Sequence, residues 1–186
     1  MSRLQKLYKE QVIPKMKAEF GYKNNLAVPK VLKVVINIGT GKTLKDPKLL
    51  DMMINNLKKI SAQVPVKTKT KKAISGFGIK SGMVVGLKAT LRKTRMYDFL
   101  DKLVNAVLPR VRDFKGLPIK SFDKKGNYTI GFKEQIVFPE LHSNEVEKIH
   151  GLEVCIQTTA KNNKEGIALL KYLGFPIIAN HVTHNA

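Results

Sequence analysis

The sequence predicts an α+β fold in which an antiparallel or mixed sheet carries helices on one face and leaves the other face open. Three observations support this prediction. Residues 30–38 and 84–92 alternate between apolar and polar side chains with the period of a β-strand. Segments with helical periodicity precede, separate and follow these two strands. Apolar residues make up 43% of the 186-residue chain, enough for the core of one domain spanning residues 1–186.

The helices are predicted from apolar residues that recur every three or four positions. The first covers residues 3–20, where Pro14 is expected to introduce a kink and Gly21 to end the helix. The second begins at Asp46-Pro47, an N-cap followed by a proline at the first helical position. Two further helices are expected over about 95–108 and 164–173.

The two alternating strands are predicted to share an open polar face. Leu32, Val34 and Ile36 would face the helices from the first strand, and Leu87 from the second. A polar residue on a strand is most simply a solvated one. Here both strands carry polar residues on the same predicted face, and both adjoin the most basic segment of the chain. This combination favours a binding surface. Its candidate residues are Lys33, Asn37, Lys88, Thr90 and Arg92.

The net charge points to a polyanionic partner. The chain has 34 basic and 14 acidic residues, giving +20. Such a protein attracts polyanions, with nucleic acid the first candidate and an anionic membrane surface the second. The charge is unevenly distributed, because residues 66–95 hold nine basic residues and no acid, whereas residues 134–186 hold six acids against four lysines. A uniformly solvated surface would not separate its charges in this way.

Residues 67–84 are predicted to form a flexible basic loop. The stretch from Lys67 to Gly86 contains five lysines, four glycines and no acidic residue. Glycine is costly inside a helix, and the first half of the stretch has no apolar face to bury in a core strand. Lysines contact RNA phosphates without requiring a base sequence, and Phe77 near the tip could pack against a ribose or base. The alternative is a surface hairpin that binds nothing.

The sequence argues against several other function classes. The single cysteine, Cys155, permits no intramolecular disulfide and lies in a predicted strand, where it is expected to pack. No stretch reaches the roughly 20 apolar residues of a membrane span, and the first residues lack the apolar run of a signal peptide, so a cytoplasmic location is expected. The histidines have no cysteine cluster near them. We therefore expect no metal, no cofactor and no catalytic group. Residues 180–186 are expected to form a frayed tail.

One segment partly matches a phosphate-binding loop. Gly41-Lys42-Thr43 follows a predicted strand and precedes a predicted helix, as the end of such a loop does. The motif also needs a glycine five positions before Gly41, and position 36 is Ile. A nucleotide-binding enzyme that uses this turn is therefore the weaker alternative. A tight turn, whose N–H groups and Lys42 could still meet a phosphate, is the simpler interpretation.

Five colinear segments together resemble one family. They are VPKVLKVVINIGTGK (28–42), KTKKAISGFGIKSGMVVGLKATLR (69–92), MYDFLDKLVNAVLPRVRDFKGL (96–117), SFDKKGNYTIGFKEQIVFPE (121–140) and GLEVCIQTTAKNNKEGIALLKYLGFP (151–176). The string RVRDFKGL followed by SFDKKGNY is the most specific part. The segments resemble the bacterial form of the universal number-five family of large-subunit ribosomal proteins, and an organelle-encoded copy would look similar.

This resemblance implies a structural, non-catalytic protein in the central protuberance of the large ribosomal subunit. It implies binding to 5S rRNA and to large-subunit rRNA, contact with peptidyl-site tRNA, and a bridge to the small-subunit head protein of the number-thirteen family. It implies neither a membrane nor a small-molecule substrate as a partner. Matched position by position, the rRNA-binding residues are Asn37, Gly39, Gly41, Lys42, Lys88, Thr90 and Arg92, and the strand pattern adds Lys33 to this predicted set. The residues of the tRNA-contacting loop are Lys71, Lys72, Ser75, Gly76, Phe77 and Lys80.

The chain departs from the family pattern at three places. Lys93 stands where the family usually has glycine, which leaves the local turn geometry open and adds a positive charge. His142-Ser143-Asn144 replaces a more acidic stretch, and the tail HVTHNA has no clear counterpart in the family.

Overall fold

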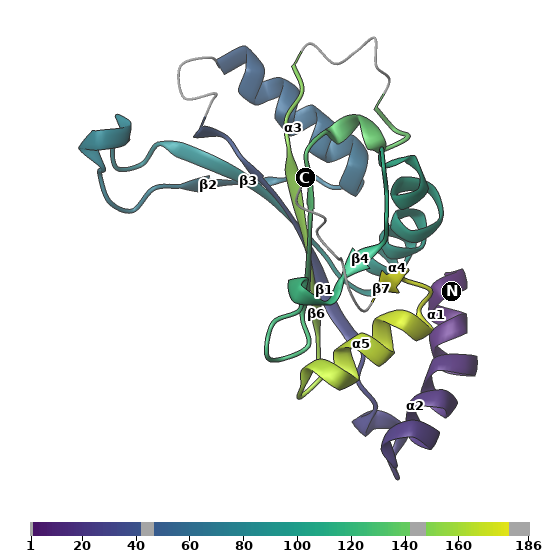
Figure 1. Ribbon diagram of the computed structural model, residues 1–186. Coiled ribbons are helices and arrows are strands. Elements are labelled where there is room, and N and C mark those ends of the chain that lie inside the picture. The colour runs from purple at the N-terminus through teal and green to yellow at the C-terminus, as the bar shows by residue number, and fades with distance from the viewer. Residues whose placement is uncertain (1, 42–46, 142–147, 179–186) are drawn as a thin grey trace, which may run out of the picture. The chain divides into compact units, whose positions relative to one another are not determined.

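The computed structural model describes residues 2–41, 47–141 and 148–178, and it confirms the α+β class. Five strands form the main sheet (Figure 1). In order across the sheet they are β2 (Val66–Lys69), β3 (Val84–Leu91), β1 (Val31–Gly39), β6 (Leu152–Thr158) and β5 (Tyr128–Phe132). Contacts between Cα atoms divide the chain into two compact units. Unit 1 comprises Met1–Val34, Arg92–Ile130 and Cys155–Ala186. Unit 2 comprises Val35–Leu91 and Gly131–Val154.

Unit 1 begins with the helical run predicted over residues 3–20. It consists of α1 (Arg3–Leu7), a π-helical turn (Tyr8–Val12) and α2 (Ile13–Phe20). The regular helix is thus interrupted just before Pro14, as expected of a residue that has no N–H to donate and crowds the preceding turn. Gly21 ends α2 in the left-handed conformation, with φ of 70°, and its N–H donates to the carbonyl oxygen of Lys17.

Two further helices complete the helical part of unit 1. They are α4 (Lys93–Lys102), extended by a π-helical turn (Leu103–Val107) and a 3-10 turn (Leu108–Arg110), and α5 (Asn163–Tyr172). Helix α1 packs on α4, and α2 packs on α5. Their facing sides bury apolar side chains that include Leu4, Val12, Met16, Leu100, Leu103, Leu169 and Leu170.

A small parallel sheet in unit 1 was not predicted. Strand β4 (Leu117–Pro118) pairs with β7 (Ile177–Ile178), and no strand was expected at either position. A strand of two residues has no periodicity to detect, so only the tertiary pairing defines it.

Unit 2 contains one helix and most of the main sheet. Helix α3 (Pro47–Ser61) begins at the predicted proline and packs against β3 (Val84–Leu91), and the predicted N-cap Asp46 lies outside the described residues. Strand β2 (Val66–Lys69) belongs to this unit, and β1 (Val31–Gly39), β5 (Tyr128–Phe132) and β6 (Leu152–Thr158) each pass through it. The core of the unit includes Ile36, Ile38, Met53, Leu57, Ile60, Leu87, Ala89, Leu91, Phe132 and Phe138.

One apolar position of β1 does not follow the predicted alternation. Val34 and Ile36 are fully buried as expected, but Leu32 is 44% exposed, and Val31 is buried instead. Two residues therefore separate the buried Val31 from the buried Val34, where a regular strand has one. A β-bulge produces this kind of phase shift.

Candidate nucleic-acid interface

The second half of β3 separates its side chains cleanly between two faces. Leu87, Ala89 and Leu91 are buried on the side that meets α3. The alternate residues lie on the opposite face, where Lys88 is exposed and Thr90 is half-buried. This is the open polar face predicted from the sequence, and within unit 2 it forms a candidate binding surface.

Side chains from neighbouring strands converge over Gly86 on this open face. A Cβ at Gly86 would lie 2.7 Å from Thr68 Oγ1 of β2, 3.3 Å from the carbonyl oxygen of Ile38, and 3.9 Å from Asn37 Oδ1 of β1. The absence of a side chain at Gly86 therefore leaves room for a hydroxyl group from β2 and an amide group from β1, which approach this position from the two strands that flank β3. The structure thus brings the predicted Asn37 next to Thr68, which the sequence reasoning did not single out.

Two residues at the edge of the sheet extend this surface. Val66 pairs with Lys88 in the β2–β3 register and is 61% exposed, so an aliphatic group lies beside the lysine. Gln63 Nε2 donates to the carbonyl oxygen of Thr90 at 3.2 Å. Sequence reasoning missed Gln63, because only the pairing of β2 with β3 brings the end of the α3–β2 connection against Thr90.

The turn after β1 is fixed by its central threonine. Thr40 is fully buried. Its N–H donates to the carbonyl oxygen of Val85 at 3.0 Å, and its hydroxyl group donates to the carbonyl oxygen of Val84 at 3.3 Å. The predicted residues Gly39 and Gly41 lie on either side of it and are exposed. The predicted Lys42 lies outside the described residues.

The segment predicted as a basic loop contains a strand. Val66–Lys69 forms β2, which pairs antiparallel with β3 at the edge of the sheet. The sequence argument failed here because it required a buried face, and an edge strand needs little more than backbone pairing. The pairing continues outward, with Thr70 N donating to the carbonyl oxygen of Met83 and Gly82 N to that of Thr70, at 2.9 and 3.0 Å.

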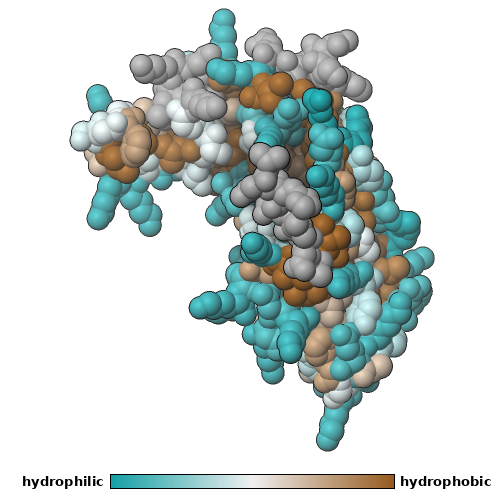
Figure 2. Space-filling model, in the orientation of Figure 1, coloured by the Kyte–Doolittle hydropathy of each residue, from teal (hydrophilic) through white to brown (hydrophobic). Residues whose placement is uncertain are grey.

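The hairpin tip is a closed turn that presents mixed chemistry. Ile74 and Ile79 form an antiparallel bridge around a 3-10 turn, Ser75–Phe77. Phe77 is 76% exposed, and Figure 2 shows hydrophobic and projecting hydrophilic side chains together at the end of this hairpin. All six predicted tip residues are exposed: Lys71, Lys72, Ser75, Gly76, Phe77 and Lys80.

Two predicted residues belong to unit 1 and not to this surface of unit 2. Lys33 is half-buried on the first part of β1, and Arg92 is exposed at the N-cap of α4. Arg92 therefore lies one residue beyond β3, although the sequence placed it in the strand. Lys93 follows it with φ of 53°, the left-handed region in which glycine is favoured. The geometry expected of a glycine is retained here with a lysine.

A hydrogen-bonded polar group lies inside unit 2. Gln135 is fully buried; its Oε1 accepts from His150 N at 2.7 Å, and its Nε2 donates to the carbonyl oxygen of Lys148 at 2.9 Å. Asn56 Nδ2 of α3 lies 3.5 Å from His150 Nε2, and His150 Nδ1 lies 3.3 Å from the carbonyl oxygen of Gly151. Burial lowers the pKa of His150, partly opposed by the Gly151 carbonyl, so the neutral ring is favoured.

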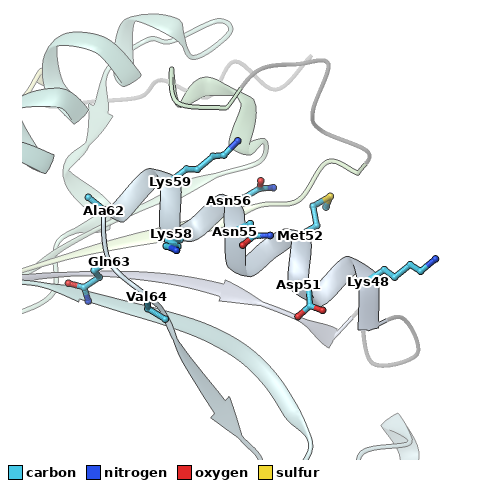
Figure 3. A pocket seen from close by; sticks show the side chains of 10 residues that line it. All are labelled: Lys48, Asp51, Met52, Asn55, Asn56, Lys58, Lys59, Ala62, Gln63 and Val64. Carbon is cyan, nitrogen blue, oxygen red and sulfur yellow. The ribbon is translucent and has the colours of Figure 1, made fainter.

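A shallow groove follows the outer side of α3. It is lined by residues of the helix, among them Lys48, Asp51 and Asn55, and by Gln63 and Val64 just after it. Figure 3 shows these side chains spread along the helix without converging on one point. A site for a small molecule needs polar groups that converge in an enclosed hollow, and this groove offers neither.

None of the helices in the described part of the chain is long and apolar enough to span a membrane.

Comparison with known proteins identifies the family. Residues 24–80 match the family described as ribosomal protein L5, and residues 84–177 match the C-terminal part of the same ribosomal protein family. Both matches include strands of the open face.

Curated relatives cover nearly the whole chain. A protein of Caldanaerobacter subterraneus subsp. tengcongensis named large ribosomal subunit protein uL5 is 52% identical over 95% of this chain and 98% of its own length. Proteins of the same name from Syntrophomonas wolfei and Trichlorobacter lovleyi are each 51% identical over 95% of this chain and 99% and 98% of their own lengths. With two family matches and full-length relatives at about half identity, the chain belongs to the L5 family of ribosomal proteins.

Proposed function

We propose that this protein is a structural component of the large ribosomal subunit that binds 5S rRNA through the open face of unit 2. The observation that carries the proposal is the convergence of Asn37 and Thr68 over Gly86, next to the exposed Lys88. Amide and hydroxyl groups hydrogen-bond to ribose, base edges and phosphate, and a lysine neutralises phosphate charge. A rigid sheet holds these groups in place before RNA arrives, which suits a permanent contact.

The hairpin tip is proposed to contact tRNA in the peptidyl site. Its exposed lysines supply sequence-independent contacts to phosphates, and Phe77 offers a ring for stacking on a ribose or base. A partner that changes in every cycle of translation is better served by a few contacts at a tip than by a broad face. The resemblance further implies contact with large-subunit rRNA and a bridge to the small-subunit head protein of the number-thirteen family. No reaction is assigned to the protein.

Two binding measurements test the proposal. The protein should sediment with large ribosomal subunits at moderate salt, and it should bind 5S rRNA in a filter assay in the presence of excess unrelated RNA of similar length. If the surface neutralises about six phosphates, log K should fall with log salt at a slope of about −5. Binding that the unrelated RNA competes away equally well would contradict a specific role for 5S rRNA.

A further inference from the structure

We propose that unit 1 carries a second site for an RNA sugar–phosphate backbone, formed by two turns in direct contact, which present four exposed lysines, and by the residue before β1, which adds a fifth. We call it the lysine knuckle. It rests on the proposed function, in that the protein acts on rRNA, but it uses none of the residues of the open face. Its members are Lys30, Lys124, Lys125, Lys161 and Lys164, all exposed.

Two glycines bring the turns into direct contact. A Cβ on Gly166 would lie 2.6 Å from the Cα atom of Gly126, and a Cβ on Gly126 would lie 2.8 Å from Ala160 Cβ and 2.8 Å from the carbonyl oxygen of Asn162. The turn that ends in Gly126 therefore rests directly on the start of α5. Lys124 and Lys125 immediately precede the first glycine, while Lys161 and Lys164 adjoin the contact on the α5 side.

Hydrogen bonds hold the turns in this arrangement. Thr158 Oγ1 donates to the carbonyl oxygen of Gly126 at 2.9 Å, and Thr158 N donates to Asn127 Oδ1 at 2.9 Å. Lys30 joins through its backbone: Lys30 N donates to Thr159 Oγ1, and Thr159 N donates to the carbonyl oxygen of Lys30, each at 2.9 Å. Three segments distant in sequence thus form one fixed support for the lysines.

The two carboxylates in the knuckle are committed to its internal hydrogen bonds. Asp123 accepts from Lys125 N, Asn127 N and Asn127 Nδ2 at 2.9, 2.8 and 2.6 Å. Partial desolvation acts to raise the pKa of Asp123, but these hydrogen bonds and the Lys125 charge lower it overall. Glu165 is buried and accepts from Lys161 N at 2.9 Å. Both carboxylates shape the turns, and five lysine charges against two carboxylates leave the surface positive.

The chemistry of the knuckle favours RNA over a membrane surface. Like charges gathered on a fixed support repel one another, and a polyanion relieves this repulsion while releasing its own counterions. Membrane binding would also call for apolar side chains to enter the lipid. The large exposed apolar side chains of the described residues are Leu26, Leu32, Val64, Val66, Ile74, Phe77 and Ile149. None belongs to the turns at 122–127 or 158–166, which carry four of the five lysines; Leu26 and Leu32 flank only Lys30.

The lysine knuckle cannot be predicted from the order of residues along the chain. Lys124 and Lys125 are far in sequence from Lys161 and Lys164, and the latter two lie within residues 134–186, where acids outnumber lysines. The net charge of a sequence window therefore does not reveal that these lysines form a cluster. Only the contact between Gly126 and Gly166 gathers them.

The test compares two variants of the full-length protein with equal charge loss. The knuckle variant carries Lys124→Gln, Lys125→Gln, Lys161→Gln and Lys164→Gln. The control variant carries Lys6→Gln, Lys9→Gln, Lys15→Gln and Lys115→Gln, four exposed lysines elsewhere in unit 1. The probes are protein-free large-subunit rRNA and 5S rRNA, measured separately by filter binding over a salt series.

The knuckle variant should bind large-subunit rRNA at least about tenfold more weakly than the control variant, with a salt slope smaller in magnitude by about 3. Its affinity for 5S rRNA should match that of the control. Wild-type protein bound to large-subunit rRNA should also show slower acetylation of Lys124 and Lys164 than of Lys9. Equal affinities of the two variants for large-subunit rRNA, or equal acetylation of all three lysines, would overturn the knuckle. Failure of the wild-type protein to bind either RNA would instead overturn the proposed function.

Discussion

Thr68 Oγ1 lies 2.7 Å from the point that a Cβ at Gly86 would occupy, closer than real Cβ contacts come. Two neighbouring strands therefore depend on a glycine at this position, although glycine inside a strand ordinarily weakens it. The space left open is filled from β2 and approached by Asn37 from β1. A residue that is unfavourable for the strand thus shapes the proposed rRNA-binding surface.

The Gly86→Ala variant should lose about 1–3 kcal/mol of unfolding free energy, because the new methyl group collides with Thr68 Oγ1 and lies in tight contact with the carbonyl oxygen of Ile38. Chemical denaturation measures this change. The double variant Gly86→Ala, Thr68→Ala should recover part of the loss, because the hydroxyl group is removed. A Gly86→Ala protein more stable than the wild type would show that the strands move apart easily and that the glycine is not required.

The hairpin tip should be dispensable for folding. Replacing residues 73–81 by a short Gly-Ser linker removes exposed residues and the Ile74–Ile79 bridge, but no part of the buried core. Binding to 5S rRNA should persist, whereas ribosomes that carry the variant should release peptidyl-site tRNA faster. The dissociation rate of tRNA from purified ribosomes is the measurement. An unchanged rate together with lost 5S rRNA binding would mean that the hairpin and the sheet face have been assigned to the wrong partners.

Lys93 offers a test of backbone strain in unit 1. Its φ of 53° costs a non-glycine residue about 1 kcal/mol, which glycine does not incur. Lys93→Gly should therefore be more stable than Lys93→Ala by about that amount. Both variants lose the same charge, so their difference in unfolding free energy isolates the conformation. If the alanine variant is as stable as the glycine variant, the left-handed geometry carries no cost here.

His150 should make the stability of unit 2 depend on pH. Burial lowers its pKa in the folded protein below the ordinary value of 6.5, so the unfolded chain takes up the proton first as the pH falls. The stabilising effect is complete above 6.5 and is lost progressively as the pH falls through and below that value. Protonation would also place a donor at Nε2, facing the amide nitrogen of Asn56.

The comparison is between wild-type protein and the His150→Gln variant, with unfolding free energies measured from about pH 8 to about pH 5. Carboxylates titrate in both proteins, so the difference between the two curves reports the histidine. The wild type should lose more stability than the variant on acidification. Parallel curves would contradict the account of His150 as a buried neutral ring.

The sequence predicted the helices and strands whose regular pattern of apolar residues extends over many positions. The alternation that buries Leu87, Ala89 and Leu91 and exposes Lys88 was correctly assigned, and so was the start of α3 at Pro47. The edge strand β2 and the two-residue strands β4 and β7 were missed, because pairing with a distant segment defines them and no local pattern does.

The candidate site was predictable to the same extent. Asn37, Lys88 and Thr90 follow from strand periodicity, which shows which face each residue occupies. Thr68 and Gln63 do not, because their positions depend on the register between β2 and β3. Arg92 was predicted to lie on the second strand, but β3 ends at Leu91 and Arg92 is the N-cap of α4. Periodicity alone does not locate this boundary.

The central claim is that the open face of unit 2 binds 5S rRNA, and the affinities of three single variants test it most directly. Asn37→Ala and Lys88→Ala change the open face, whereas Lys133→Ala removes an exposed lysine of unit 2 just after β5, at the opposite edge of the main sheet from β2. Each open-face variant should weaken 5S rRNA binding by about 1–3 kcal/mol while thermal unfolding stays unchanged. The Lys133→Ala protein should bind nearly as the wild type does. Wild-type affinity in both open-face variants, or an equal loss in the Lys133→Ala control, would show that the open face does not bind 5S rRNA.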